Sequence, residues 1–139
     1  MINTVSLGLA KELDGLGLKI ETEKWYCDVA DHRFGRENDR DFRLYDLDTA
    51  KARKYNSKGK DLQYPAPSTD ELLAVMPKEI TIIHIGLLIG GFCISFETSN
   101  WKDNLHLESD KSLPEALGLM CKYLLTNGYK FNGKELVRK

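Results

Sequence analysis

The stretch YPAPSTDELLAVMPKEI, residues 64–80, decides the fold of the C-terminal half of the chain. Ser68 and Glu71 have the spacing of a capping box, in which a serine hydroxyl and a glutamate carboxylate each accept a backbone N–H at a helix start. Pro67 keeps the preceding chain extended, and Pro77 ends the helix after about two turns. An apolar strand follows. These helix-capping and turn signals predict the start of a folded unit and not a catalytic loop.

The run ITIIHIGLLIGGFCISF, residues 80–96, predicts a buried β-hairpin. Its β-branched residues favour strands, and the adjacent Gly90 and Gly91 favour a turn. A membrane-spanning helix needs about 20 apolar residues. This run is shorter, and the polar residues His84 and Ser95 interrupt it. We therefore expect no membrane contact.

The run SLPEALGLMCKYLLTNG, residues 112–128, predicts the longest helix. Ser112 and Glu115 form a second capping-box pattern, and Gly128 is placed to close the helix in the left-handed conformation. Apolar residues that recur at i, i+4, i+7 and i+11 predict a stripe that faces the core. These are Leu113, Leu117, Met120 and Leu124.

The N-terminal half predicts a helix, a hairpin and a second helix. Asn3 or Thr4 is expected to cap the first helix, and Asp48 the second. The expected elements are a helix at 3–14, strands at 18–30 and 42–48, a helix at 48–55, and a linker-like connection at 56–67 rich in turn-forming residues.

Together these signals predict a single α+β domain over residues 1–139, with an antiparallel sheet packed against helices. A chain of 139 residues is one domain by size, and 42% apolar with 29% charged residues is an ordinary globular composition. We expect a helix-plus-hairpin half at 1–62 and a helix-hairpin-helix half at 63–139. A further strand at 104–109 would give the second half an α-β-β-(β)-α order.

Charge and cysteine content exclude several classes of protein. The formal net charge of −1 gives no global field that attracts nucleic acid or a membrane surface, although a local patch stays open. The odd number of scattered cysteines, Cys27, Cys93 and Cys121, favours reduced thiols and therefore a cytoplasmic location. The N-terminal residues also lack the pattern of a signal peptide.

We find no pattern of residues that predicts catalysis, a metal or a cofactor. The acidic loop contains Asp28, Asp31, His32, Glu37, Asp39 and Asp41, but interleaved arginines favour local ion pairs over a metal site. An enzyme that uses this loop is the third and least favoured hypothesis. A hairpin turn centred at Leu88 would pair residue 84 with residue 92, which places Cys93 poorly for a catalytic couple with His84.

Two features are candidates for binding. The run KARKYNSKGK, residues 51–60, contains no acid, and its cations are candidate nucleic-acid contacts or simply a solvated loop. These are Lys51, Arg53, Lys54, Lys58 and Lys60. Trp101 stands in a polar segment and is a candidate contact for a partner, or else folds back over the hairpin.

The segments 64–80 and 110–129, together with the N-terminal LAKELDGLGLKIETEKWYC, resemble a family of small uncharacterised proteins encoded by phages and prophages of anaerobic gut bacteria. This resemblance covers most of the chain and implies an intracellular accessory protein of a mobile element. It implies no activity and no functional residue. Two looser resemblances are to antitoxins of the HicB kind and to double-stranded-RNA-binding domains. The latter carry lysines at the start of the last helix, where this chain has Ser112-Leu113-Pro114-Glu115.

The sequence thus favours a non-catalytic protein-interaction module that binds a host or phage protein. The alternative is a nucleic-acid-associated regulator, either antitoxin-like or RNA-binding, that uses residues 51–60. The apolar hairpin tip IGLLIGGF, residues 85–92, is compatible with burial in a homodimer.

Overall fold

The computed structural model describes residues 4–28, 42–59, 62–78, 80–88, 91–98, 104–109 and 112–139. The elements are α1 (Leu7–Gly15), β1 (Lys24–Asp28), β2 (Phe42–Asp46), α2 (Leu47–Asn56), β3 (Gln63–Pro65), α3 (Thr69–Ala74), β4 (Ile80–Leu88), β5 (Gly91–Thr98), β6 (Asn104–Ser109), α4 (Leu113–Thr126), β7 (Tyr129–Phe131) and β8 (Leu136–Arg138). All strand pairs are antiparallel, so the predicted α+β class is confirmed. Within these residues, no helix combines the length and apolar character required to cross a bilayer.

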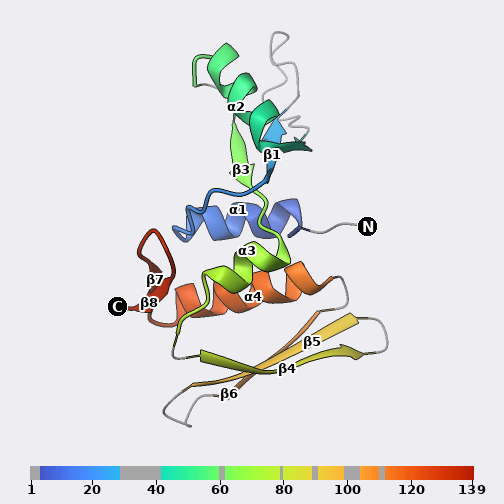
Figure 1. Ribbon diagram of the computed structural model, residues 1–139, viewed down its shortest axis with the longest axis vertical. Coiled ribbons are helices and arrows are strands. Elements are labelled where there is room, and N and C mark those ends of the chain that lie inside the picture. Colours follow the sequence, from blue (N-terminus) through green and yellow to red (C-terminus); the bar gives the residue numbers. More distant parts are fainter. Residues whose placement is uncertain are drawn as a thin grey trace.

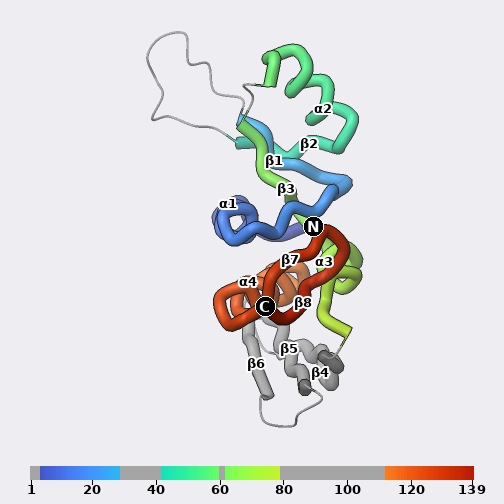
Figure 2. The backbone as a smooth tube through the Cα atoms, turned by 90° about the vertical axis from the view of Figure 1, so that its left-hand side faces the viewer, coloured from blue at the N-terminus to red at the C-terminus, as the bar shows by residue number. Residues whose placement is uncertain are grey.

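The elements form layers along the long axis of the molecule (Figure 1). The sheet β2-β1-β3, with α2 beside it, lies at one end, and the sheet β4-β5-β6 lies at the other. Helices α1, α3 and α4 lie between the two sheets. Figure 2 shows the same order from the side, with the β7-β8 hairpin next to α4. The predicted α-β-β-β-α order of the C-terminal half, including its third strand, is confirmed.

The main core lies where α1 packs against α4. Leu9 and Leu13 of α1 are buried, and they join a cluster with the predicted stripe residues Leu117, Met120 and Leu124 of α4. The two helices approach closely at Gly118, where an added Cβ would lie 2.6 Å from Leu9 Cδ2 and 2.9 Å from Val5 Cγ1. The core therefore joins segments from the two ends of the sequence.

The deciding segment folds as its sequence predicts. Ser68 Oγ accepts from the Glu71 N–H at 3.4 Å, and Glu71 Oε1 accepts from the Ser68 N–H at 2.9 Å. The second carboxylate oxygen, Oε2, accepts from the backbone N–H of Glu23 at 2.9 Å. Glu71 therefore starts α3 and also holds the chain that leads into β1.

The second capping box is only half formed. Ser112 Oγ accepts from the Glu115 N–H at 3.3 Å, as predicted. The Glu115 carboxylate does not return to Ser112, because it accepts from both the backbone N–H and the hydroxyl of Ser6, at 2.7 and 2.8 Å. Ser6 is the N-cap of α1. Glu115 therefore completes the cap of a different helix.

The start of α1 differs from the prediction. Ser6, and neither Asn3 nor Thr4, caps the helix by accepting from the Leu9 N–H. The reason is that the chain before Ser6 is extended: Thr4 forms a β-bridge with Ser68, and the Val5 N–H donates to Pro67 O at 3.1 Å. Tertiary pairing outcompetes the local capping signal here.

The predicted linker at 56–67 is wrong in part, because it contains β3. Tyr64 of β3 lies opposite Tyr26 of β1, in a register that also pairs Gln63 with Cys27. Three residues are too few to show an alternating sequence pattern.

The register of the C-terminal hairpin also differs from the prediction. The closing pair is Leu88 with Gly91, so His84 lies opposite Ser95 and Cys93 lies opposite Gly86. The predicted pairing of residue 84 with residue 92 is wrong because it assumed a turn centred on Leu88.

Candidate functional site

The candidate site is the exposed face of α2, and it begins with a capped helix. Asp46 is the N-cap, because its carboxylate accepts from the Thr49 N–H at 2.9 Å. This backbone hydrogen bond lowers the pKa of Asp46. The predicted cap, Asp48, lies instead in the first turn, where a carboxylate interacts favourably with the helix dipole.

One face of α2 packs on the sheet β2-β1-β3 through small and polar groups. Ala50 is buried, and its carbonyl accepts from Gln63 Nε2 at 2.8 Å. The Arg53 guanidinium donates to the carbonyl of Asp28 at 3.0 Å and lies over the Tyr45 ring, 5.3 Å from its centroid. These contacts orient the helix, so its opposite face points to solvent.

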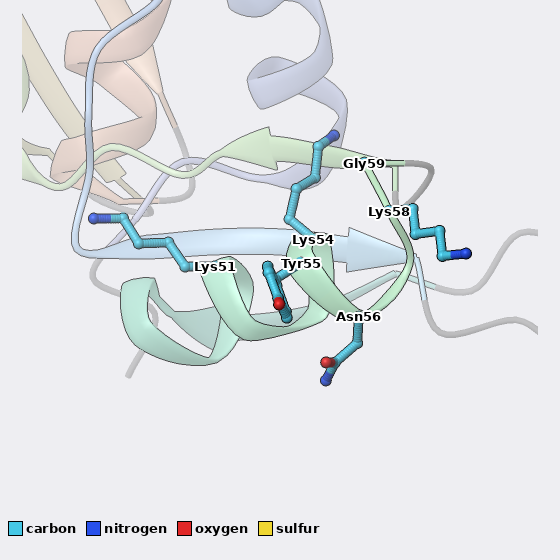
Figure 3. Close-up of a pocket in the computed structure, with 6 residues that line it drawn as sticks. All are labelled: Lys51, Lys54, Tyr55, Asn56, Lys58 and Gly59. Atoms are coloured by element: carbon cyan, nitrogen blue, oxygen red, sulfur yellow. The ribbon is translucent and has the colours of Figure 1, made fainter.

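The exposed side of α2 carries Lys51, Lys54 and Tyr55, at the i, i+3, i+4 spacing of neighbours on a helix surface. Lys58 lies beyond the end of α2, directly after its C-cap Ser57. All four are exposed. They line a hollow of about 700 Å³ together with Asn56 and Gly59. In Figure 3, Tyr55 lies between Lys51 on the helix and Lys58 on the turn that follows it.

The C-terminus of α2 places a lysine in an unusual backbone conformation. The Gly59 N–H donates to Lys54 O at 2.8 Å, and the Lys58 N–H donates to Tyr55 O at 3.0 Å, which together form a Schellman motif. This motif requires a left-handed residue, usually glycine, directly after the C-cap. Lys58 occupies that position with φ of 56°. A lysine is therefore held at the rim of the hollow at a conformational cost.

The electrostatics of the hollow favour an anion. The described residues that line it include three lysines and no carboxylate. Nearby, Lys51 Nζ lies 3.4 Å from Glu21 Oε1, and the two side chains are 65% and 69% exposed. Such an exposed ion pair is weak and is screened by salt, so an anionic ligand can compete with Glu21.

The structure brings some of the predicted residues together and separates others. Lys51, Lys54 and Lys58 share the hollow, whereas the Arg53 guanidinium faces the sheet. Lys60 and Trp101 lie outside the described residues. The acidic loop also lies outside them, except for Asp28, which is buried at the end of β1.

Tyr55 is a site residue that the sequence did not single out. It is 85% exposed and lines the same hollow as the lysines. The signal that could have identified this site is the helical spacing of residues 51, 54 and 55. That signal has meaning only on a helix, and a run of five cations is equally typical of a solvated loop.

Other polar groups of the described chain form no reactive site. Burial raises the pKa of Cys121 to about 12, so its thiol stays protonated at neutral pH. Burial also raises the pKa of Tyr26, whose hydroxyl donates to Val5 O at 2.7 Å. Among the described residues, no group of His, Cys, Asp and Glu side chains is arranged to hold a metal ion.

A second hollow, of about 250 Å³, lies where the β7-β8 hairpin meets the chain after α3. It is lined by Pro77, Lys78, Glu135, Leu136, Val137 and Arg138. Its charges are mixed, with Lys78 Nζ 3.7 Å from Glu135 Oε1. It therefore offers no preference for a ligand of one charge.

Comparison of the chain with models of protein families, with curated proteins and with solved structures finds no match.

Proposed function

We propose that this chain is a non-catalytic nucleic-acid-binding protein that contacts its ligand through the exposed face of α2. One observation carries the proposal: three lysines line one hollow, Lys51 and Lys54 from α2 and Lys58 from the turn that ends it. Lysines that neutralise phosphates release counterions, and this release drives nucleic-acid binding without requiring base-specific contacts. The net charge of −1 does not oppose this, because a local cluster is sufficient.

The test is the salt dependence of binding to labelled oligonucleotides of mixed sequence, measured by fluorescence anisotropy. A triple variant, K51Q/K54Q/K58Q, removes three cations while glutamine keeps a similar helix propensity. For single strands we expect the slope of log affinity against log salt to flatten by about 2, or roughly 0.7 for each phosphate that the variant no longer neutralises.

The matched control is K130Q/K134Q/K139Q, which changes the net charge by the same amount. Those three exposed lysines lie in and around the β7-β8 hairpin, away from α2 (Figure 1). An equal loss of affinity in both triple variants would indicate a net-charge effect and contradict the assignment of the site. Absence of binding to any oligonucleotide at low salt would contradict the proposed function itself.

A protein-interaction module of a phage or prophage is the hypothesis that the sequence favours. A pull-down with and without nuclease separates it from the present proposal. A partner protein that is retained after nuclease treatment, and is also retained by the K51Q/K54Q/K58Q variant, would support the interaction module.

A further inference from the structure

Tyr55 is exposed far beyond any other large apolar side chain of the described residues. Its exposed fraction is 85%, whereas the next values, for Leu44 and Tyr123, are 41% and 39%. The ring makes no contribution to the core, and an alanine would suit the helix better. Packing within the fold therefore does not explain an aromatic ring at this position.

The neighbours of Tyr55 in the hollow are cations. Lys51 precedes it by one helical turn, and Lys54 and Lys58 lie beside and after it (Figure 3). An exposed aromatic ring among cations that can follow a phosphate backbone is the arrangement used to bind single-stranded nucleic acid, since any unpaired base can stack on the ring. In a duplex the base faces are already stacked on each other and are not accessible to the ring.

We infer that the exposed face of α2 binds single-stranded nucleic acid in preference to duplex, with an unpaired base stacked on Tyr55. The phosphates that flank this base form ion pairs with Lys51, Lys54 and Lys58. This inference rests on the proposed function and adds to it the strand form of the ligand and the residue that selects it.

The experiment compares an oligonucleotide with its own duplex at one salt concentration. Y55A is expected to lower the affinity for the single strand by on the order of tenfold, the usual cost of removing one base–aromatic stack. It should leave the salt slope unchanged, because the charge of the site stays the same. The affinity for the duplex should change little. Alanine favours the helix, so unfolding of α2 would not account for the result.

Two further variants separate stacking from other effects. Y55F keeps the ring and should bind the single strand as the wild type does. Y55L keeps apolar area without an aromatic face and should bind like Y55A. Y123A, which removes the exposed tyrosine of α4, is the control and should bind like the wild type.

The outcomes of the two proposals are distinguishable. If Y55A binds the single strand as tightly as the wild type, or is weakened by the same factor on single strand and duplex, the stacking inference is overturned. The proposed function survives in either case, provided that K51Q/K54Q/K58Q still weakens binding more than its matched control.

Discussion

Glu115 of α4 caps α1 through Ser6, a residue 109 positions earlier in the chain. Its two carboxylate oxygens accept the Ser6 N–H at 2.7 Å and the Ser6 hydroxyl at 2.8 Å, and the residue is only 6% exposed. A carboxylate at a helix N-terminus also interacts favourably with the helix dipole, so the Glu115 side chain stabilises the starts of both α1 and α4.

Replacing Glu115 is therefore expected to destabilise the whole fold. E115A leaves the Ser6 N–H without its acceptor and removes a hydrogen-bonded charge, so we expect the free energy of unfolding to fall by about 3 kcal/mol. E115Q keeps one acceptor and should lower it by about 1 kcal/mol. Urea denaturation measures both.

The control for this prediction is E12A. Glu12 forms an exposed ion pair with Lys122, which also joins α1 to α4 but is worth less than about 1 kcal/mol. An E115A variant no less stable than E12A would show that the inter-helix cap is dispensable.

Two helical glycines should respond oppositely to alanine. At Gly118 a new Cβ would lie 2.6 Å from buried Leu9, so overpacking between α1 and α4 should outweigh the gain in helix propensity and cost about 1 kcal/mol. At Gly8 of α1 nothing lies within 4 Å, so G8A should stabilise by about 0.5 kcal/mol. Thermal or urea unfolding measures the stability of both variants. A G118A variant more stable than the wild type would mean that the Leu9 side chain moves aside at little cost.

Two substitutions of Lys58 should separate its effect on stability from its effect on nucleic-acid binding. K58G relieves the left-handed backbone and should raise the free energy of unfolding by about 1 kcal/mol, while it removes one phosphate contact and flattens the salt slope by about 0.7. K58Q removes the same charge but keeps the same backbone conformation, so it should weaken binding without stabilising. Equal binding by K58G and the wild type would exclude Lys58 from the interface.

Glu21 should compete with the ligand for Lys51. E21Q removes the carboxylate 3.4 Å from Lys51 Nζ and is expected to raise oligonucleotide affinity about twofold, an effect that should fade at high salt. E12Q makes the same change of net charge beside Lys122, away from α2, and serves as the control. An equal gain in oligonucleotide affinity in E12Q would indicate an effect of net charge and not of the Glu21–Lys51 pair.

Cys121 makes the fold less stable at alkaline pH. Its thiol ionises near the ordinary pKa of 9.0 in the unfolded chain but only at about 12 in the folded protein. Its contribution to stability is therefore fully present below pH 9 and is lost as pH rises from 9 towards 12, because only the unfolded state gains by ionising. C121A has no thiol and does not show this decline.

The measurement for Cys121 is urea unfolding of the wild type and C121A between about pH 8 and about pH 10.5, a range that spans the unfolded-state pKa. At the lower pH the alanine variant should be less stable, because it leaves a small cavity in the core. The difference in the free energy of unfolding between the wild type and C121A should become smaller as pH rises. A difference that is independent of pH would contradict the raised pKa.

Local signals predicted the elements of this fold well. The Ser68–Glu71 box, the stripe of α4 and the order α3-β4-β5-β6-α4 all follow from short sequence patterns, whereas the strands β7 and β8 were not predicted. What could not be predicted depends on long-range contacts. The partner of Glu115, the extended chain before Ser6 and the short strand β3 are set by residues distant in sequence.

The candidate site could be predicted only as a set of cations. The sequence predicted five cations between residues 51 and 60 as one set of candidate contacts. It could not show that Arg53 faces the sheet whereas Lys51, Lys54 and Lys58 line one hollow. That orientation depends on Tyr45 and the carbonyl of Asp28, which pattern analysis does not bring near the helix. Once α2 is recognised as a helix, the exposure of Tyr55 follows from its spacing to the lysines.

The cap between Glu115 and Ser6 also has a consequence for biosynthesis. The first helix and its N-cap Ser6 are made early. Glu115, which completes the cap, and the face of α4 that covers the helix are made more than a hundred residues later. At ordinary elongation rates the ribosome needs roughly 5 to 20 seconds to extend the chain from one to the other. During that interval the apolar side of α1 has no α4 to pack against, so α1 can join the core only after α4 has been made.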